Sequence, residues 1–258
     1  MIIISMTSYP KRIKYVAKAF ASILMTKVPK NEYHCVLTLS KLEFPNLEKD
    51  LPNDLQTIIS SGMVEVIWTE DNQRSHKKLM PTLAKYPNNP ILIIDDDVYR
   101  TTEWLNAFVE THKKYPNDII VGAFWKKFSL QNGNIIEQTC MNDTYRTTKY
   151  ANKVMVGYKP ANGTGGTLYP PGTFTDKRFF DKELYMKLSP SSDETWQFCF
   201  NIIELRTFRQ LPVAHNEKFI DDSQKVAMNK NHGRYKQIYS DLYKAFPEFK
   251  VNMIKVLK

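Results

Sequence analysis

The 258-residue sequence has few cysteines and none of the spacings in which cysteines usually act together. Cys35, Cys140 and Cys199 lie far apart, and no two of them form a CxxC pair. An odd and dispersed set of this kind argues against a disulfide framework and against a zinc cage. Free thiols persist in a reducing compartment, so we expect the protein in the cytoplasm.

Long apolar runs are also missing. No stretch approaches the roughly 20 apolar residues that a membrane-spanning helix needs. The segment 1–6 lacks the basic region and the extended apolar stretch of a secretory signal. We therefore interpret this segment as the first strand of the fold.

Basic residues outnumber acidic ones by 36 to 27, which gives a formal net charge of +9 and a pI of about 9.2. This balance attracts nucleic acids, anionic lipids and phosphorylated ligands. The sequence has no helix-turn-helix, zinc finger or aromatic-basic RNA motif, so we favour phosphate-bearing ligands and expect no nucleic-acid partner. The basic and apolar tail, residues 244–258, has two interpretations: peripheral contact with an anionic inner membrane, or an element packed on the domain.

The first 125 residues alternate short apolar runs with segments of helical periodicity. The runs with strand character are residues 2–5, 33–39, 64–68, 91–94 and 119–121. Helical spacing occurs in residues 14–25, 55–61, 77–86 and 104–114. Thr101 or Thr102 is the expected N-cap of the last of these helices. The alternation predicts the α/β class, with a mostly parallel central sheet flanked by helices and ligands bound beyond the carboxyl ends of its strands.

The second half of the chain has a mixed character. Residues 125–175 are rich in aromatic, Asn, Thr and Gly residues, which favours strands, hairpins and loops. Helical spacing returns in residues 195–205, 221–228 and 235–246. No linker separates the two halves, so we expect a single domain over residues 1–258, divided functionally near residue 125.

Three aspartates follow the apolar run 91–94 without a break. On an extended chain Asp95 and Asp97 project to the same side, with roughly 7 Å between their Cα atoms. Two carboxylates at the end of a buried strand suit a divalent cation that also holds phosphate oxygens. The alternative is that the aspartates only solvate the end of the strand.

Polar segments also follow the first and third strands. The first segment offers hydroxyls, a ring and a cation for a nucleotide, in Thr7, Ser8, Tyr9, Pro10 and Arg12. The second offers groups for a base and cations for a pyrophosphate, in Asp71, Asn72, Arg74, Lys77 and Lys78. The alternatives are an ordinary turn in the first case and a solvated helix start in the second.

Three further features are candidates for function. Gly165 and Gly166 belong to a glycine-rich run that matches neither GxGxxG nor a P-loop, and they indicate either a tight turn or close approach of a ligand. Asp193 and Glu194 open a helix, where acids are electrostatically favoured, and either of them is a candidate general base. His215 is a candidate third metal ligand, although a lone histidine is more often structural.

Four parts of the chain resemble bacterial nucleotide-sugar glycosyltransferases of the GT-A fold, close to the family 2 group that builds capsule and lipopolysaccharide sugars. These parts are SMTSYPKRI at 5–13, RSHKKL at 74–79, IDDDVY at 94–99, and GTGGTLYPP at 163–171 with SDETW at 192–196. The first part and the GGxLYPP run are the most specific to the family. The resemblance implies a GT-A fold with a donor half, residues 1–125, and an acceptor half, residues 126–258.

The resemblance also implies roles for the candidate residues. Asp95 and Asp97 resemble the DxD motif that holds Mn²⁺ or Mg²⁺ against the donor diphosphate, with Asp96 between them at the donor. The segments around Thr7 and Lys77 resemble the donor rim. Relatives carry an acidic pair, commonly Asp-Asp before x-Trp, where this chain has Asp193 and Glu194, so either acid could be the base, and we favour Asp193. The implied reaction transfers a sugar from a nucleoside diphosphate, UDP favoured, to a hydroxyl of a glycan or lipid-linked acceptor, with inversion.

Two other classes of function fit parts of the sequence. A metal-dependent nucleotidyltransferase or phosphohydrolase also places acids at strand ends, but it would more usually carry a glycine-rich loop after the first strand, and residues 7–12 contain no glycine. A non-catalytic module that binds polyanions would account for the net charge but would need no aspartates at the strand end.

Overall fold

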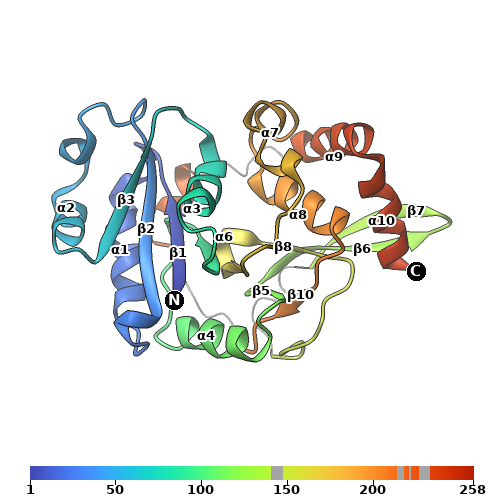
Figure 1. Ribbon diagram of the computed structural model, residues 1–258, viewed down its shortest axis with the longest axis horizontal. Coiled ribbons are helices and arrows are strands. Elements are labelled where there is room, and N and C mark those ends of the chain that lie inside the picture. The colour runs from blue at the N-terminus through green and yellow to red at the C-terminus, as the bar shows by residue number, and fades with distance from the viewer. Residues whose placement is uncertain (141–147, 214–217, 221, 227–232) are drawn as a thin grey trace.

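The computed structural model describes residues 1–140, 148–213, 218–220, 222–226 and 233–258. Its centre is a seven-stranded sheet with the strand order β10-β5-β9-β4-β1-β2-β3 (Figure 1). The strands are β1 Ile2–Thr7, β2 Tyr33–Ser40, β3 Val64–Thr69, β4 Ile91–Ile94, β5 Ile119–Val121, β9 Thr167–Tyr169 and β10 Phe208–Gln210. Only β9 among them pairs antiparallel with its neighbours, so the prediction of a mostly parallel α/β sheet is confirmed.

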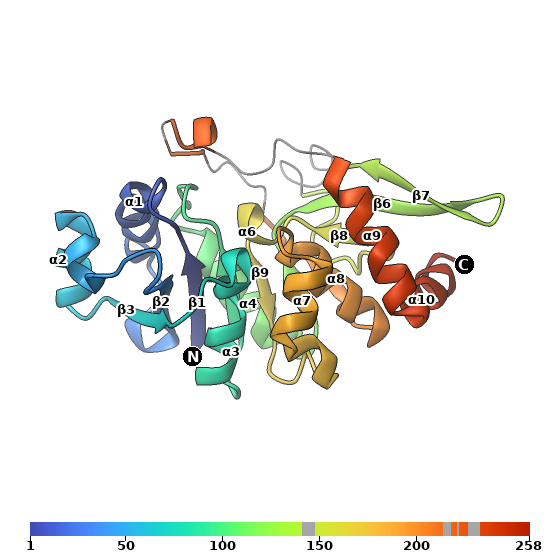
Figure 2. The same ribbon diagram turned by 90° about the horizontal axis from the view of Figure 1, so that it is seen from above.

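Helices cover both faces of this sheet. The helices that the structure describes are α1 Ile13–Leu24, α2 Asn53–Ser60, α3 Met80–Lys85, α4 Trp104–Lys114, α6 Asn162–Gly165, α7 Lys182–Leu188, α8 Asp193–Ile203, α9 Gly233–Ala245 and α10 Pro247–Leu257. Buried residues of α1, α2 and α4 share one hydrophobic cluster, and those of α8, α9 and α10 share the other. Figure 2 shows α1 and α3 on opposite sides of β1.

Successive side chains of the central strands point to opposite faces of the sheet and so belong alternately to these two clusters. In β1, Ile2 and Ile4 belong to the cluster with α1, while Ile3 belongs to the cluster with α8. In β4, Leu92 belongs to the cluster with α1, while Ile93 belongs to the cluster with α8. Strands buried on both faces need apolar residues at successive positions, which is why these runs are continuous in the sequence.

The register of β1 fixes which residues reach the carboxyl edge of the sheet. Met6 lies opposite Leu37 of β2 on one side and opposite Ile94 of β4 on the other. Thr7 and Asp95, which follow these paired residues, therefore emerge at the same edge. This register positions the site described below.

A second sheet of three antiparallel strands, β7-β6-β8, belongs to the second half of the chain. Its strands are β6 Phe124–Gln131, β7 Asn134–Thr139 and β8 Tyr158–Pro160. The β6–β7 hairpin runs beside α10, which buries Phe249 and Met253 (Figures 1 and 2). The tail is therefore a packed helix. No helix among the described residues combines the length and the apolar character that crossing a bilayer requires.

Three local expectations differ from the structure. Instead of one helix over residues 77–86, the chain forms a 3₁₀ helix, Arg74–Lys78, followed by α3. The helix is interrupted because Pro81 at the start of α3 cannot continue a helix that began at Lys77. The N-cap of α4 is Glu103 rather than a threonine, and its side chain makes no capping bond. Of the expected helix 221–228 the structure describes a turn at Asp222 and a short 3₁₀ helix, Ser223–Val226, and positions 221, 227 and 228 lie outside the described residues.

We expect Gly166→Ala to destabilise the protein strongly. Gly166 has φ +85°, and a Cβ atom there would lie 2.6 Å from Cζ2 of Trp104. Backbone strain of about 1–3 kcal/mol at φ +85°, ψ 142° should add to overpacking of about 1–3 kcal/mol. The measurement is the free energy of unfolding in urea.

Gly133→Ala is the matched control. Gly133 has φ +78° in the turn of the β6–β7 hairpin, and nothing lies within 4 Å of its added Cβ. In this variant the free energy of unfolding should fall only by the cost of backbone strain. Equal losses for the two variants would show that the contact with Trp104 carries no penalty.

Candidate functional site

The polar segments that follow β1, β3 and β4 meet at one cavity of about 620 Å³. A cavity of this size can enclose a small ligand, and it lies at the carboxyl edge of the parallel strands. Its other wall comes from the second half of the chain, chiefly the start of α8. The lining residues are Thr7, Ser8, Tyr9, Arg12, Glu43, Asn72, Arg74, Ser75, Lys77, Lys78, Asp95, Asp96, Asp97, Trp125, Thr164, Ser191, Ser192, Asp193, Glu194, Phe219, Gln224 and Tyr235.

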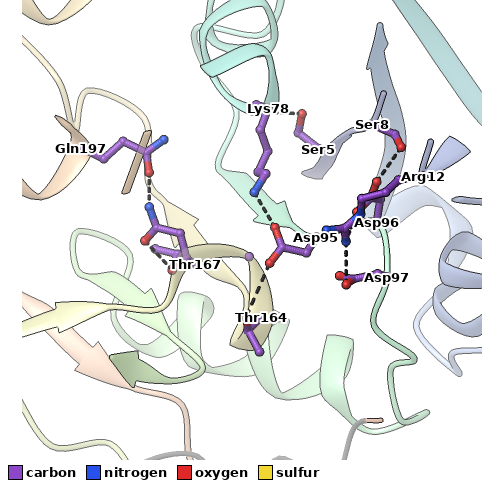
Figure 3. A network of polar contacts seen from close by, with 12 residues as sticks. Ser5, Ser8, Arg12, Lys78, Asp95, Asp96, Asp97, Thr164, Thr167 and Gln197 are labelled. Carbon is purple, nitrogen blue, oxygen red and sulfur yellow. Dashed lines mark hydrogen bonds and ion pairs between the residues drawn. The ribbon is translucent and has the colours of Figure 1, made fainter. Parts of the chain in front are cut away.

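The three aspartates follow β4 in a turn, so the alternation of an extended strand does not set their directions. Asp95 faces Lys78, whose Nζ lies 2.6 Å from Asp95 Oδ1. Asp97 faces Arg12, whose Nη2 lies 2.6 Å from Asp97 Oδ2 (Figure 3). Gln224 Nε2 also donates to Asp97 Oδ2, at 2.7 Å. Asp95 and Asp97 therefore both line the cavity, as expected, but Asp95 is turned toward Lys78 and Asp97 toward Arg12.

Asp96 connects the turn to the residues that follow β1. Ser8 Oγ donates to Asp96 Oδ2 at 2.5 Å, and Arg12 Nη2 lies 2.5 Å from Asp96 Oδ1. Arg12 therefore pairs with two carboxylates at once, and its position at the start of α1 ties that helix to the end of β4.

Three nearby cations act on the three aspartates. Burial, opposed by Arg12, raises the pKa of Asp96 to about 6. Burial and then the charge of Asp95 raise the pKa of Asp97 as well. Burial also acts to raise the pKa of Asp95, but Lys78, together with Arg12 and Arg100, outweighs it and the pKa is lowered. Arg12, Lys78 and Arg100 thus supply as many positive charges as the three ionised carboxylates would supply negative ones.

Two adjacent lysines of the 3₁₀ helix have different partners. Lys78 is buried and is held in place by Ser5 of β1, whose Oγ donates to the Lys78 carbonyl at 2.6 Å. Lys77, also buried, pairs with Glu43, which lies beyond the end of β2. The ammonium of Lys77 is therefore neutralised within the protein, whereas that of Lys78 faces the aspartates.

The glycine-rich run supports Asp95 from the other side. The amide of Asp95 donates to the Gly163 carbonyl at 3.1 Å, and a Cβ atom on Gly163 would lie 1.8 Å from Asp95 Oδ1. Arg100 Nη2 also donates to the Gly163 carbonyl, at 2.7 Å. Gly163 is thus the glycine that allows Asp95 its position, and the requirement comes from the protein's own carboxylate.

The acidic pair also lines the cavity, at the start of α8. Ser192 caps this helix and accepts from the Thr195 amide at 3.2 Å. Asp193 is 5% exposed, and its Oδ2 has no hydrogen-bond partner within the described part of the chain. Burial, and then the charges of Asp193 and Asp95, raise the pKa of Glu194 to about 7 against the opposing effect of Lys159.

Some residues that the sequence singled out do not line the cavity. Pro10 is exposed, and Asp71 instead pairs with Lys182 of α7 at 2.5 Å. Gly165 and Gly166 are packed against Ala123 and Trp104, so the close approach they allow is to the protein's own core rather than to a ligand. His215 lies outside the described residues.

Other lining residues were not anticipated from the sequence. Thr164 lies within the glycine-rich run that had been singled out, whereas Glu43 follows the second strand and belongs to no motif. Trp125, Phe219 and Tyr235 come from distant segments, and only the fold brings their rings to the cavity. Aromatic residues are common in cores, so sequence offered no reason to prefer these three.

The sheet order and the site at its carboxyl edge define a GT-A fold, as the resemblance implied. No family model and no curated protein matches the sequence. Solved structures do match: S. aureus TarS 1–349 in complex with UDP has a TM-score of 0.60 and 14% identity, over 99% of this chain and 69% of that one. The same S. aureus protein in complex with UDP-GlcNAc gives a TM-score of 0.54 and 14% identity, over 99% and 70%. Identities this low establish the shared fold alone.

We expect Glu194 to make the protein less stable as the pH rises from about 5 to 7. The folded state raises the pKa of this carboxyl to about 7, so below that pH it binds a proton that the unfolded chain has already released. The free energy of unfolding should therefore fall across this interval relative to Glu194→Gln, by about 1–3 kcal/mol. Urea unfolding of both proteins at several pH values measures it, and parallel curves would contradict the expectation.

Proposed function

We propose that the protein is a metal-dependent glycosyltransferase that uses a nucleoside-diphosphate sugar, with UDP as the favoured nucleotide. One observation carries the proposal: the aspartates after β4 and the acidic pair of α8 line a single cavity, together with Arg12 and Lys78, the cations that pair with the aspartates. The fold shared with a protein solved in complex with UDP and UDP-GlcNAc supports the choice of donor.

Residues of the first half would hold the donor. Thr7, Ser8 and Asn72 offer hydroxyl and amide groups to a ribose or a base at the carboxyl edge of the sheet. Arg12, Arg74 and Lys78 line the cavity and would face a diphosphate, while Lys77 is paired with Glu43. The positive charge that now compensates Asp95, Asp96 and Asp97 would then be shared with the phosphates.

The aspartates fit a divalent cation that arrives with a diphosphate. Within the described residues no three Asp, Glu, His or Cys side chains gather closely enough to cage a metal by themselves. Asp95 and Asp97 are hard oxygen donors beside the cavity, and Mg²⁺ typically takes one or two carboxylates together with substrate phosphates and water. Bound there, Mn²⁺ or Mg²⁺ would neutralise the charge that develops on the departing diphosphate.

The acidic pair would serve the acceptor. Asp193 is the better candidate for the general base, because its buried Oδ2 is without a hydrogen-bond partner among the described residues and so can accept the proton of a hydroxyl. It lines the same cavity as the aspartates that would hold the leaving group. A hydroxyl activated there would attack the anomeric carbon of the donor in a single displacement with inversion.

We expect Asp97→Asn to abolish most of the gain in UDP affinity that Mn²⁺ provides. Loss of a ligand carboxylate should weaken metal-dependent binding by about 10- to 100-fold or more. Calorimetric titration of UDP with and without Mn²⁺ measures the effect, after a thermal-shift screen of UDP-, GDP-, CMP- and dTDP-sugars identifies the donor. Asp54→Asn, an exposed change on α2, is the matched control and should behave as the wild type.

The proposal that Asp193 is the base predicts a separate outcome. Asp193→Asn should lower turnover by about 10²- to 10⁴-fold while UDP binds with unchanged affinity, because a general base contributes to the transition state. Glu194→Gln is the companion variant, and the larger loss of turnover identifies the base.

Analysis of the released product separates this function from its rivals. A nucleoside diphosphate is expected, whereas inorganic pyrophosphate would indicate a nucleotidyltransferase. Binding of UDP that is indifferent to Mn²⁺ in the wild type would overturn the metal-dependent donor site.

A further inference from the structure

A buried lysine, Lys159, lies behind the acidic pair. It belongs to β8, is 4% exposed, and does not line the cavity. Lysine is rarely buried unless its charge is compensated, because removal of an ammonium group from water is costly. The proposed function gives this residue no role.

The contacts of Lys159 lead to the start of α8. Its Nζ donates to Thr195 Oγ1 at 2.8 Å, and Thr195 Oγ1 lies 2.7 Å from the Oγ of Ser192, the N-cap of the helix. The rings of Tyr235 and Tyr239 in α9 are each centred 5.5 Å from the ammonium. The ammonium that β8 carries is thus enclosed by groups of α8 and α9.

This location is electrostatically unfavourable for a cation taken alone. The N-terminus of a helix carries partial positive charge, and it favours acids over bases. What compensates Lys159 is chiefly Glu194, which has the largest favourable charge interaction with the ammonium, followed by Glu137 and then Asp193. Removal of Lys159 would leave Glu194 without the positive charge that most favours its ionised form.

We propose that Lys159 is a positioning residue that holds the start of α8 through Thr195 and Ser192 and favours the ionised form of the neighbouring Glu194. The role rests on the proposed function, because the acidic pair supplies the base and a base accepts a proton only in its ionised form. Without the ammonium, burial and the neighbouring carboxylates would raise the pKa of Glu194 further.

Other charges act on the same groups. Asp193 and Asp95 disfavour ionisation of Glu194, while Lys159 and Lys78 favour it, in an environment where burial is the largest effect. Lys126 of β6 opposes the charge of Lys159. Lys78 already pairs with Asp95, so Lys159 is the cation whose removal should act most directly on the acidic pair.

The test is the titration of Glu194 by NMR on protein with ¹³C-labelled glutamate, with Glu194→Gln to assign the signal. The wild-type midpoint should lie near pH 7. In Lys159→Met the midpoint should rise by about one pH unit or more. Lys127→Met removes the same charge from an exposed position of β6 and should leave the midpoint unchanged.

Two further variants separate charge from packing. Lys159→Arg keeps the charge and should restore the wild-type midpoint. Lys159→Gln is neutral but can still donate to Thr195, so it carries the test if the methionine variant does not fold. A wild-type midpoint in both neutral variants, or an equal shift in Lys159→Arg, would overturn the proposal.

Turnover gives a second readout of the same role. The acidic limb of the pH profile of kcat/KM should move upward in Lys159→Met, with rescue by Lys159→Arg. A profile that does not move would contradict the proposal. If the wild-type protein transfers no sugar, the proposed function fails, while the NMR titration still decides the role of Lys159.

Discussion

Charge compensation at the carboxyl edge of the sheet is the interaction on which the site depends. Parallel strands deliver their terminal residues to one edge, and here that edge receives three aspartates, of which Asp96 and Asp97 are buried and Asp95 is half-buried. Carboxylates so close together and so poorly solvated need cations, and Arg12 and Lys78 provide them from two different segments. The same pairs fix α1 and the 3₁₀ helix against β4, so one set of contacts both orders the edge and prepares a surface for an anionic ligand.

The site is built in two layers with different tasks. Groups that line the cavity carry the charges that a substrate would meet. Groups behind them fix the positions and influence the protonation of these lining residues. Ser5 and Gly163 act in this way on Lys78 and Asp95. Hydrogen-bonded support of this kind reduces the reorganisation needed when a ligand binds, which is how preorganised sites gain their effect.

Much of the first half could be predicted from the sequence, because its strands are continuous apolar runs separated by helical periods. The same patterns placed the polar segments at the correct edge. The partners could not be predicted: periodicity does not say that Lys77 would pair with Glu43 while Lys78 faces Asp95. Nor does it reveal that Gly166 packs on a tryptophan, since glycine serves ligands and cores through the same absence of a side chain.

The position of β9 has a consequence for how the chain is assembled. This strand comes from the second half of the sequence, yet it lies between β4 and β5, and Thr167 is paired with Ile93 on one side and Val121 on the other. Until that residue leaves the ribosome, the inner edges of both strands have unsatisfied backbone groups. Folding of the nascent chain is therefore expected to wait for synthesis well beyond residue 125, and a fragment that ends there would expose an apolar sheet edge prone to aggregation.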